Sequence, residues 1–531
     1  MQIRQFPDPS TFRRLARHHN VIPVCVELLA DTLTPVSLLG HFHRCQSSPL
    51  FLLESVEGGE RWGRYSFLGI SSRCRIKVLP DVVSFADAAG IERIPHHGRP
   101  FALLKAYMAR FKAADLPQLP RFWGGLVGYL AYEAVSFFEP VAGAPRGAGS
   151  LAQFVLPDAL MIFDNVRHSL FCLALAYLDE KSPVDRVYAL AEQRIASMLA
   201  SLEHPPALPA DNGSVPPPAR AVVPPATSFM AAVRQIKERI RSGDVIQTVI
   251  SQPFVYEPAP DAWSLYRAQR YINPSPYLFF LAFDDITLVG SSPETMVRLE
   301  NGAATLRPIA GTRPRGRSAK QDRLLADEML KDEKERAEHL MLVDLGRNDL
   351  GRVAETGSVQ VTELMVVERY SHVMHLVSNI TCDLAQDLGA WDLLQAAFPA
   401  GTLTGAPKIK AMEIIAALEN MERGPYGGAV GYIGFDGNMD MAITIRTAVI
   451  ENGRLTVRAG AGIVADSDPQ KEYEESVNKA KSVERAMALL AEQPLPGLKS
   501  RSAAAATDDG RFSASGVAGR KQMQVNPEVP Q

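Results

Sequence analysis

The sequence predicts an α+β fold built on large, mostly antiparallel β-sheets. Strand-like runs follow one another directly along much of the chain and do not alternate strictly with helices. Hydrophobic residues make up 46% of the 531 residues, which is enough for a sizeable core. A chain of this length forms two or three ordinary domains or one large two-lobed unit.

In the N-terminal part, apolar and β-branched runs predict strands, and apolar residues at helical spacing predict a helix. The strands are Phe51–Glu54, Ser66–Ile70, Ala159–Phe163 and Leu170–Ala176, and the helix is Val184–Leu202. Eight prolines then fall within His204–Ala226, a composition typical of a linker or a long surface loop.

After the proline-rich stretch, the same patterns continue to Ala491. The predicted helices are Ser228–Ser242, Ala319–Leu345 and Pro469–Ala491. The predicted strands are Val245–Pro253, Leu278–Phe283, Thr287–Ser291, Glu294–Glu300, Ala429–Phe435, Met441–Glu451 and Arg454–Ala459. From Pro494 the composition turns to Ser, Ala, Gly and Arg, which predicts a disordered tail. We therefore divide the sequence into an N-terminal region (1–203), a linker or loop (204–226), a second region (227–493) and a tail (494–531).

Charge and composition argue against several classes of partner. The net charge of −3 argues against binding to nucleic acid or to a membrane surface. Glu27 and Asp31 interrupt the most hydrophobic early stretch, so we expect neither a signal peptide nor a spanning helix. The cysteines lie far apart without metal-ligand spacing, which predicts reduced thiols in a cytoplasmic protein. They are Cys25, Cys45, Cys74, Cys172 and Cys382.

The predicted terminal helix carries charged residues beside its apolar face. Glu472, Glu475 and Lys479 stand at i, i+3 and i+7, within an arc of roughly 60°. Ser467 or Asp468 provides a cap in front of a first-turn proline. The adjoining stripe consists of Tyr473, Val477, Ala480, Val483 and Met487. We therefore expect the carboxylates at the edge of a buried face.

A second glutamate pair precedes an apolar run. Glu335 and Glu338 are again three apart, and Leu340–Val343 is expected to be buried. A buried carboxylate needs a partner, which is either a nearby base such as Lys334 or Arg336 or a hard cation shared with the terminal helix. Because Mg²⁺ usually takes one or two protein carboxylates, we expect one glutamate per helix as ligand and the other behind it.

Further candidates for anion or ligand binding are less specific. Arg307–Gly316 predicts a basic turn whose amides and Thr312 hold an anion, or a plain surface loop. Arg446 in an apolar strand should meet an anion if it faces the interior, and otherwise points outward. The small residues of Arg458–Ile463 allow a ligand to touch the backbone, although tight packing explains them equally well.

Some candidates gain meaning only from a wider pattern. His375 in a strand-like run is more often structural than catalytic, and Gln247 and Glu294 stand near strand ends. The pattern comes from Pro308–Thr312, Glu338–Asp344, Gly401–Lys408 and Pro469–Lys479. In these stretches the chain resembles the chorismate-utilising enzyme family, densely from Phe229 to Leu490. The resemblance implies two large, mostly antiparallel sheets in a sandwich-like core, with helices outside and the active site in a cleft.

The resemblance implies a role for each candidate. Glu338 and Glu475 match Mg²⁺ ligands, with Glu335 and Glu472 beside them, and the metal would hold the ring carboxylate of chorismate. Tyr426 and Arg446 match the residues that hold the enolpyruvyl carboxylate. Other substrate-binding positions are Gly311, Thr312, Thr402, Gly460, Ala461, Gly462 and Lys479. The catalytic candidates are Glu294 and His375, for proton transfer to the leaving hydroxyl and for pyruvate elimination, together with Gln247.

Two positions indicate the nucleophile. Some relatives have a lysine at Ala310 that attacks the ring, and others have a water-activating lysine at Gln247. Neither side chain here can do this, which favours ammonia and a reaction that yields anthranilate and pyruvate, in tryptophan biosynthesis. No cysteine lies in a Gly-x-Cys-x-Gly turn, so we expect a separate glutamine amidotransferase subunit to supply the ammonia.

Two segments resemble the halves of a tryptophan feedback site in the same family, although each also fits an ordinary strand end or turn. The residues concerned are Glu54, Ser55, Asn273, Pro276, Tyr277 and Leu278. Feedback inhibition typically corresponds to a coupling of about 1–3 kcal/mol. The alternatives are an aminodeoxychorismate synthase and a non-catalytic tryptophan or chorismate sensor. A sensor would need to have lost catalytic groups, and all the expected ones are present.

Overall fold

The computed structural model describes residues 2–45, 49–55, 63–141, 149–179, 182–203, 219–222, 225–370 and 373–491. These residues belong to one compact unit, Met1–Glu492. The predicted tail over 494–531 and most of the proline-rich stretch lie outside the described residues.

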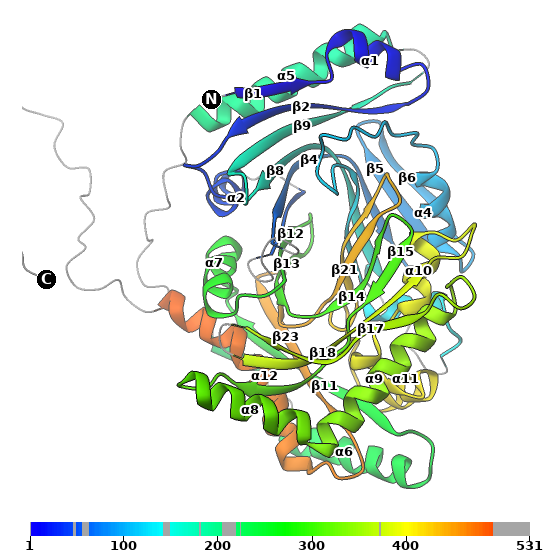
Figure 1. The fold of residues 1–531 in the computed structure, drawn as a ribbon, viewed down its shortest axis with the longest axis vertical. Coiled ribbons are helices and arrows are strands. Elements are labelled where there is room, and N and C mark those ends of the chain that lie inside the picture. The colour runs from blue at the N-terminus through cyan, green and yellow to red at the C-terminus, as the bar shows by residue number, and fades with distance from the viewer. Residues whose placement is uncertain are drawn as a thin grey trace, which may run out of the picture. The chain divides into compact units, whose positions relative to one another are not determined.

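The first part of the chain supplies strands with a few covering helices (Figure 1). The order is β1 (Gln2–Phe6), α1 (Pro9–Leu15), β2 (Val21–Leu29), α2 (Pro35–Arg44), β3 (Leu50–Glu54), β4 (Tyr65–Val78), β5 (Val82–Asp87), β6 (Gly90–Pro95), α4 (Pro100–Met108), β7 (Gly125–Leu130), η1 (Tyr132–Phe137), β8 (Ala152–Asp164), β9 (Ser169–Tyr177) and α5 (Val184–Glu203).

The second part contributes the remaining strands and most of the helices. The order to Asp383 is β10 (Ala219–Val222), α6 (Ala226–Arg241), β11 (Gln247–Glu257), α7 (Ala262–Ile272), β12 (Tyr277–Ala282), β13 (Thr287–Ser292), β14 (Thr295–Glu300), β15 (Ala303–Leu306), β16 (Ile309–Pro314), α8 (Ala319–Lys331), α9 (Glu333–Gly351), β17 (Gln360–Arg369) and β18 (Val373–Asp383). Then follow α10 (Ala390–Ala397), η2 (Gly401–Leu403), β19 (Gly405–Ala406), α11 (Lys408–Leu418), β20 (Ala429–Gly434), β21 (Met439–Ile443), β22 (Thr447–Glu451), β23 (Arg454–Ile463) and α12 (Pro469–Ala491).

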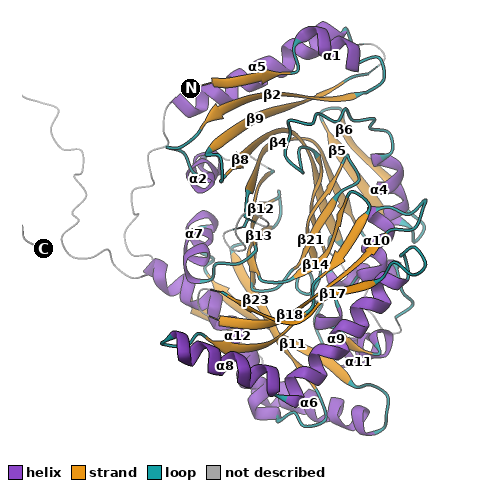
Figure 2. Ribbon diagram, in the orientation of Figure 1, coloured by secondary structure: helices purple, strands orange, loops and turns teal. Residues whose placement is uncertain are grey.

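The strands form a continuous antiparallel network. Strands from both sides of the proline-rich stretch pair directly, as β3 does with β12 and β7 with β20. Figure 2 shows the strands curving through the interior while the helices lie on the outside. The predicted α+β class with large antiparallel sheets is confirmed. The division of the sequence at 204–226 stays a prediction.

Burial follows the predicted faces. A large core cluster packs α5, α7 and α12 against β2, β9, β11 and β12. On α12, Ala480, Val483 and Met487 are buried, and Val477 packs against the same cluster. The apolar stripe predicted for this helix therefore faces the core, and its charged neighbours border it.

Two long predicted elements are each divided into two in the structure. The predicted helix Ala319–Leu345 is α8 and α9, because Asp332 adopts an extended conformation and caps α9 by accepting from the amides of Lys334 and Glu335. The predicted strand Met441–Glu451 is β21 and β22, interrupted at Arg446 with φ of 50°. The prediction of a single continuous element was wrong in both cases.

Two predicted environments also differ from the structure. The segment Arg307–Gly316 is not a turn, because Ile309–Pro314 forms β16 and pairs with β18 around a bulge at Gly311. The prediction that Leu340–Val343 is buried was wrong for part of the segment, since Leu340 is 47% exposed while Leu342 and Val343 are buried. An all-apolar run on a helix covers every direction around the axis, and only one of these directions meets the core.

Candidate active site

Gln247 and the glycines of β23 form one wall of the site. Strand β11 pairs with β23 so that Val249 faces Gly462 and Ser251 faces Gly460. A Cβ atom at Gly462 would lie 2.4 Å from Gln247 Nε2. A side chain at position 462 would therefore displace the Gln247 amide from its present place. The backbone carbonyl of Gly460 accepts a hydrogen bond from Lys479 Nζ at 3.1 Å, which brings α12 to the same wall.

The glutamates of α9 and α12 influence one another. Burial raises the pKa of Glu338, and the charges of Glu335 and Glu475 add to the effect. Burial also raises the pKa of Glu472, which the Ser467 hydroxyl opposes and the Glu475 charge supports. Gln247 Nε2 donates to Glu338 Oε1 at 3.4 Å. The structure thus brings together the two glutamate pairs and Gln247.

The partners of these glutamates differ from the bases suggested by the sequence. Glu335 pairs with Arg313 at 2.9 Å, and Glu475 pairs with Lys479 at 2.7 Å. Lys334 acts on Glu338 only through its charge, which lowers the pKa. Neither Glu338 nor Glu472 forms an ion pair with any described residue.

Cation binding by this cluster stays a prediction. Within the described residues, no group of three or more His, Cys, Asp or Glu side chains is arranged to hold a metal ion. The Glu475 charge nevertheless raises the pKa of Glu338 by repulsion. Two such carboxylates are a suitable donor set for Mg²⁺, which takes its remaining ligands from water or substrate.

His375 lies against the bulge of β16. Its Nδ1 atom is 3.0 Å from the Gly311 carbonyl and 3.1 Å from Thr312 Oγ1. Gly311 has φ of 61°, and a Cβ atom there would lie 3.2 Å from Glu335 Oε2. Burial lowers the pKa of His375, and the Arg446 charge lowers it further against the effect of the Gly311 carbonyl. His375 is therefore neutral near pH 7, with Nε2 free to accept a proton if Nδ1 donates to Gly311.

Glu294 is a buried carboxyl group with an unusual pKa. It directly precedes β14, and burial raises its pKa to about 7. The Thr402 hydroxyl and the charges of Arg446 and Lys479 act in the opposite direction. These predicted substrate-binding groups therefore surround a carboxyl group that exchanges a proton near neutral pH.

Arg446 connects this carboxyl group to the rest of the site. Its left-handed backbone turns the chain between β21 and β22, and its charge acts on both Glu294 and His375. The interpretation of Arg446 as an outward-facing strand residue is wrong, because it is partly buried and donates to Asn273 Oδ1 at 3.4 Å. Tyr426 is buried below the Arg423 guanidinium, 5.8 Å from the ring centroid, and burial raises its pKa to about 12.

A separate pocket contains most residues of the predicted tryptophan site. Glu54, Ser55, Pro276, Tyr277 and Leu278 line it together, because β3 pairs with β12. Asn273 lies outside this lining and contacts Arg446 instead. Arg121 and Asp440 also line the pocket, and no sequence pattern had indicated them.

Glu54 leaves one oxygen available in this pocket. Burial raises the pKa of Glu54, while Arg270, which pairs with it, lowers the pKa. Its Oε2 atom is buried and has no well-formed hydrogen bond to any described residue, although the Tyr266 hydroxyl is close enough to lower the pKa. The adjacent walls are aromatic, with Phe67, Phe279 and Tyr432. A ligand with a cationic group and an apolar ring would complement both features.

Among the described residues, no helix is both long enough and apolar enough to cross a membrane.

Comparisons with known proteins identify the family of the chain. The chorismate binding enzyme family matches residues 70–485. Anthranilate synthase component 1 from Pseudomonas putida is 46% identical over 490 residues, covering 90% of this chain and 98% of that protein. The protein of the same name from Acetivibrio thermocellus is 42% identical over 490 residues, covering 91% and 98%.

Solved structures give the same result. Anthranilate synthase component I from Streptococcus pneumoniae has a TM-score of 0.70 and 34% identity, covering 86% of this chain and 98% of that one. The menaquinone-specific isochorismate synthase from Escherichia coli has a TM-score of 0.67 at 20% identity, covering 90% and 100%, which shows the fold alone. The chain belongs to the chorismate-binding enzyme family. It is a chorismate-utilising enzyme of the lyase class.

Proposed function

We propose that this chain is the large subunit of a cytoplasmic, Mg²⁺-dependent anthranilate synthase. It would convert chorismate and ammonia into anthranilate and pyruvate for tryptophan biosynthesis. One observation carries the proposal: the pKa values of two proton-transfer groups beside the same arginine are shifted in opposite directions. Glu294 has a pKa near 7 and His375 a lowered pKa, and Arg446 acts on both. The names of the anthranilate synthase relatives support the same reaction.

The charged groups fit a substrate with two carboxylates. Arg446 and Lys479 provide positive charge around Glu294. Glu338 and Glu475 would hold Mg²⁺, which neutralises the second carboxylate when it is bound. Glu335 stays paired with Arg313, which suits a supporting role behind the ligands. Tyr426 closes the site from the loop before β20.

The shifted pKa values assign the proton transfers. Ammonia forms a bond to the ring carbon while the hydroxyl leaves, and protonated Glu294 donates the proton that releases the hydroxyl as water. The new ammonium group then loses one proton to solvent, which gives the neutral amine. Neutral His375 then accepts a ring proton through Nε2 as the enolpyruvyl group leaves and takes up a proton as pyruvate. Gln247 remains a neutral hydrogen-bond donor to Glu338, and it cannot activate water.

The source of ammonia is a partner subunit. Ala310 lies on β16 and has no nucleophilic group, so attack by the protein on the ring is excluded at that position. The relatives are named component 1, which supports a second component. We propose that this component is a glutamine amidotransferase that delivers ammonia to the site.

A product assay tests the proposal. Purified chain, chorismate, Mg²⁺ and an ammonium salt should produce fluorescent anthranilate without any other protein. Formation of aminodeoxychorismate would assign the chain to the related synthase. Binding of tryptophan or chorismate without turnover would indicate a sensor.

We further propose that tryptophan inhibits the enzyme from the pocket beside Glu54. The Glu54→Gln substitution should raise the inhibition constant for tryptophan about 10- to 100-fold, because a charge-assisted hydrogen bond contributes about 1.5–3 kcal/mol. The KM for chorismate should not change, since Glu54 is on β3 and lacks contact with the catalytic groups. Unchanged inhibition in a folded variant would exclude this pocket as the tryptophan site.

A further inference from the structure

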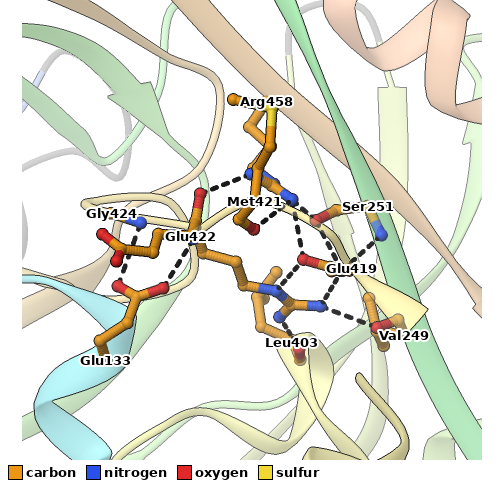
Figure 3. Close-up of polar contacts among 10 residues, drawn as sticks. Glu133, Val249, Ser251, Leu403, Glu419, Met421, Glu422, Gly424 and Arg458 are labelled. Atoms are coloured by element: carbon orange, nitrogen blue, oxygen red, sulfur yellow. Dashed lines mark hydrogen bonds and ion pairs between the residues drawn. The ribbon is translucent and has the colours of Figure 1, made fainter. Parts of the chain in front are cut away.

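A buried cluster of one carboxylate and two guanidinium groups lies behind the substrate-binding strands. The side chains of Arg423, Glu419 and Arg458 are only 2%, 4% and 5% exposed. None of the three belongs to the catalytic or ligand-binding residues assigned above. Figure 3 shows Glu419 and Arg458 in a network of hydrogen bonds that draws on β11, β23, η2 and the loop after α11.

Glu419 is the acceptor that joins the cluster. Its Oε1 atom accepts from the Ser251 amide at 2.8 Å, from Ser251 Oγ at 2.9 Å and from Arg423 Nη2 at 2.6 Å. Its Oε2 atom accepts from Arg423 Nε at 3.0 Å and from Arg458 Nη2 at 2.9 Å. Burial raises the pKa of Glu419, but the two arginines outweigh burial and leave the pKa below its usual value. Glu419 is therefore ionised at neutral pH.

The two arginines extend the network to backbone carbonyls. Arg423 donates to the carbonyls of Leu403 at 2.7 Å and Val249 at 2.9 Å. Arg458 donates to the carbonyls of Glu422 at 2.7 Å and Met421 at 3.3 Å. A guanidinium group has five donors in a fixed plane, so each arginine fixes several segments in one relative orientation.

Each of these segments carries a residue of the active site. Leu403 follows Thr402, and Val249 stands two residues after Gln247 on β11. Arg458 stands two residues before Gly460 on β23, and Arg423 begins the loop that leads to Tyr426. This loop has a further anchor, because Glu133 on η1 accepts from the amides of Arg423 at 2.6 Å and Gly424 at 3.1 Å.

The cluster also sets the position of Tyr426. The Arg423 guanidinium lies between two aromatic rings, 4.4 Å from the centroid of Tyr132 and 5.8 Å from that of Tyr426. The charges of Arg423 and Arg458 lower the pKa of Tyr426, against the larger effect of burial. Movement of Arg423 would therefore displace a residue that we place next to the substrate.

Stability alone gives a weak reason for such a cluster. Well-packed apolar side chains are often as stabilising as a buried ion pair, whereas directional hydrogen bonds specify one arrangement. We propose that Glu419 is a positioning residue, which, through Arg423 and Arg458, holds the strands and loops of the chorismate site in register. The inference rests on the proposed function for the identity of the substrate.

The test compares Glu→Gln substitutions at two buried glutamates that each accept from an arginine. Glu419→Gln removes the charge at the centre of the cluster. Glu27→Gln is the matched control, because Glu27 is also buried and accepts from Arg4 at 2.5 Å and Ser169 Oγ at 3.0 Å. Glu27 is on β2, which lies at the opposite end of the unit from α6 (Figure 1).

Both variants should have a lower Tm, but only Glu419→Gln should alter the handling of chorismate. For this variant we expect kcat/KM to fall on the order of 100-fold, with at least about a tenfold rise in KM, because small misplacements in an active site have effects of this size. Glu27→Gln should keep the wild-type KM. A wild-type KM in folded Glu419→Gln would overturn the inference.

A milder variant covers the case in which Glu419→Gln does not fold. Ser251→Ala removes one hydroxyl that donates to Glu419 and accepts from Arg458 Nε at 2.9 Å. It should raise KM severalfold with little change in Tm, and an unchanged KM would contradict the proposal. If wild-type protein forms no anthranilate, the proposed function fails instead, and calorimetric titration with chorismate then compares the same variants.

Discussion

Glu338→Gln is expected to abolish anthranilate formation while the protein stays folded. The loss should be on the order of 100-fold or more, since even groups behind a metal ligand contribute about 10- to 100-fold. Glu475→Gln should have the same effect. The measurement is anthranilate fluorescence at saturating Mg²⁺ and chorismate.

The stability of Glu338→Gln should match or exceed that of the wild type at pH 8. The folded-state pKa of Glu338 is raised by burial and by the charges of Glu335 and Glu475. A raised pKa means that the folded state holds a proton which the unfolded state releases, so this glutamate reduces stability as the pH rises above its ordinary value. Glutamine removes that dependence, and the loss of activity cannot then be explained by unfolding.

Two neighbouring glutamates provide controls on the same helices. Glu335→Gln should reduce activity only about tenfold. In the wild type Glu335 is paired with Arg313 and would support the metal ligands without binding the metal itself. Glu474→Gln should retain full activity, because Glu474 is exposed and accepts a hydrogen bond from Gln470 at 2.8 Å on the same helix. Full activity of Glu338→Gln or Glu475→Gln at saturating Mg²⁺ would exclude the proposed metal ligands.

The sequence predicted those parts of the site that depend on local geometry. The i, i+3 spacing of Glu335 with Glu338 and of Glu472 with Glu475 places each pair on one helix face, and both helices exist. That the glutamates of the two helices lie close enough for the Glu475 charge to act on Glu338 depends on the tertiary structure. From the sequence, a cation shared by the two helices was one of two alternatives, and the family resemblance favoured it. The predicted strands were likewise found, because alternation and burial are properties of short segments.

The remaining features depend on contacts between distant segments. Glu419 is 168 residues from Ser251 and 39 residues from Arg458 along the chain. Nothing in the sequence around Glu419 or Arg458 distinguishes these residues from ordinary surface charges. The interruptions at Asp332 and Arg446 were not predicted either, because a charged helix-type run continues across Asp332 and a strand-type run of apolar and β-branched residues continues across Arg446. The interruption at Asp332 is caused by its capping side chain. The interruption at Arg446 brings the arginine close enough for its charge to act on Glu294 and His375.

A second large effect is expected from the pH dependence of Glu294. Its folded-state pKa is about 7, so the carboxyl group is mostly protonated below pH 7 and can donate a proton. Above pH 7 the protonated fraction falls about tenfold per pH unit. If Glu294 protonates the leaving hydroxyl, kcat should stay level toward lower pH near neutrality and decrease with a slope of −1 above pH 7.

The Glu294→Gln substitution separates this role from a structural one. It should reduce kcat by about 100- to 10,000-fold, the usual contribution of a general acid. The kcat of the variant should no longer decrease above pH 7, so the pH profile loses this limb. The wild-type carboxyl group binds a proton in the folded state that the unfolded state releases between its ordinary pKa of 4.5 and about 7. Wild-type stability should therefore fall with rising pH across this interval relative to the variant. A pH limb that persists in Glu294→Gln would assign the proton donor to another group, whereas loss of the limb with retained Tm identifies Glu294 as the acid.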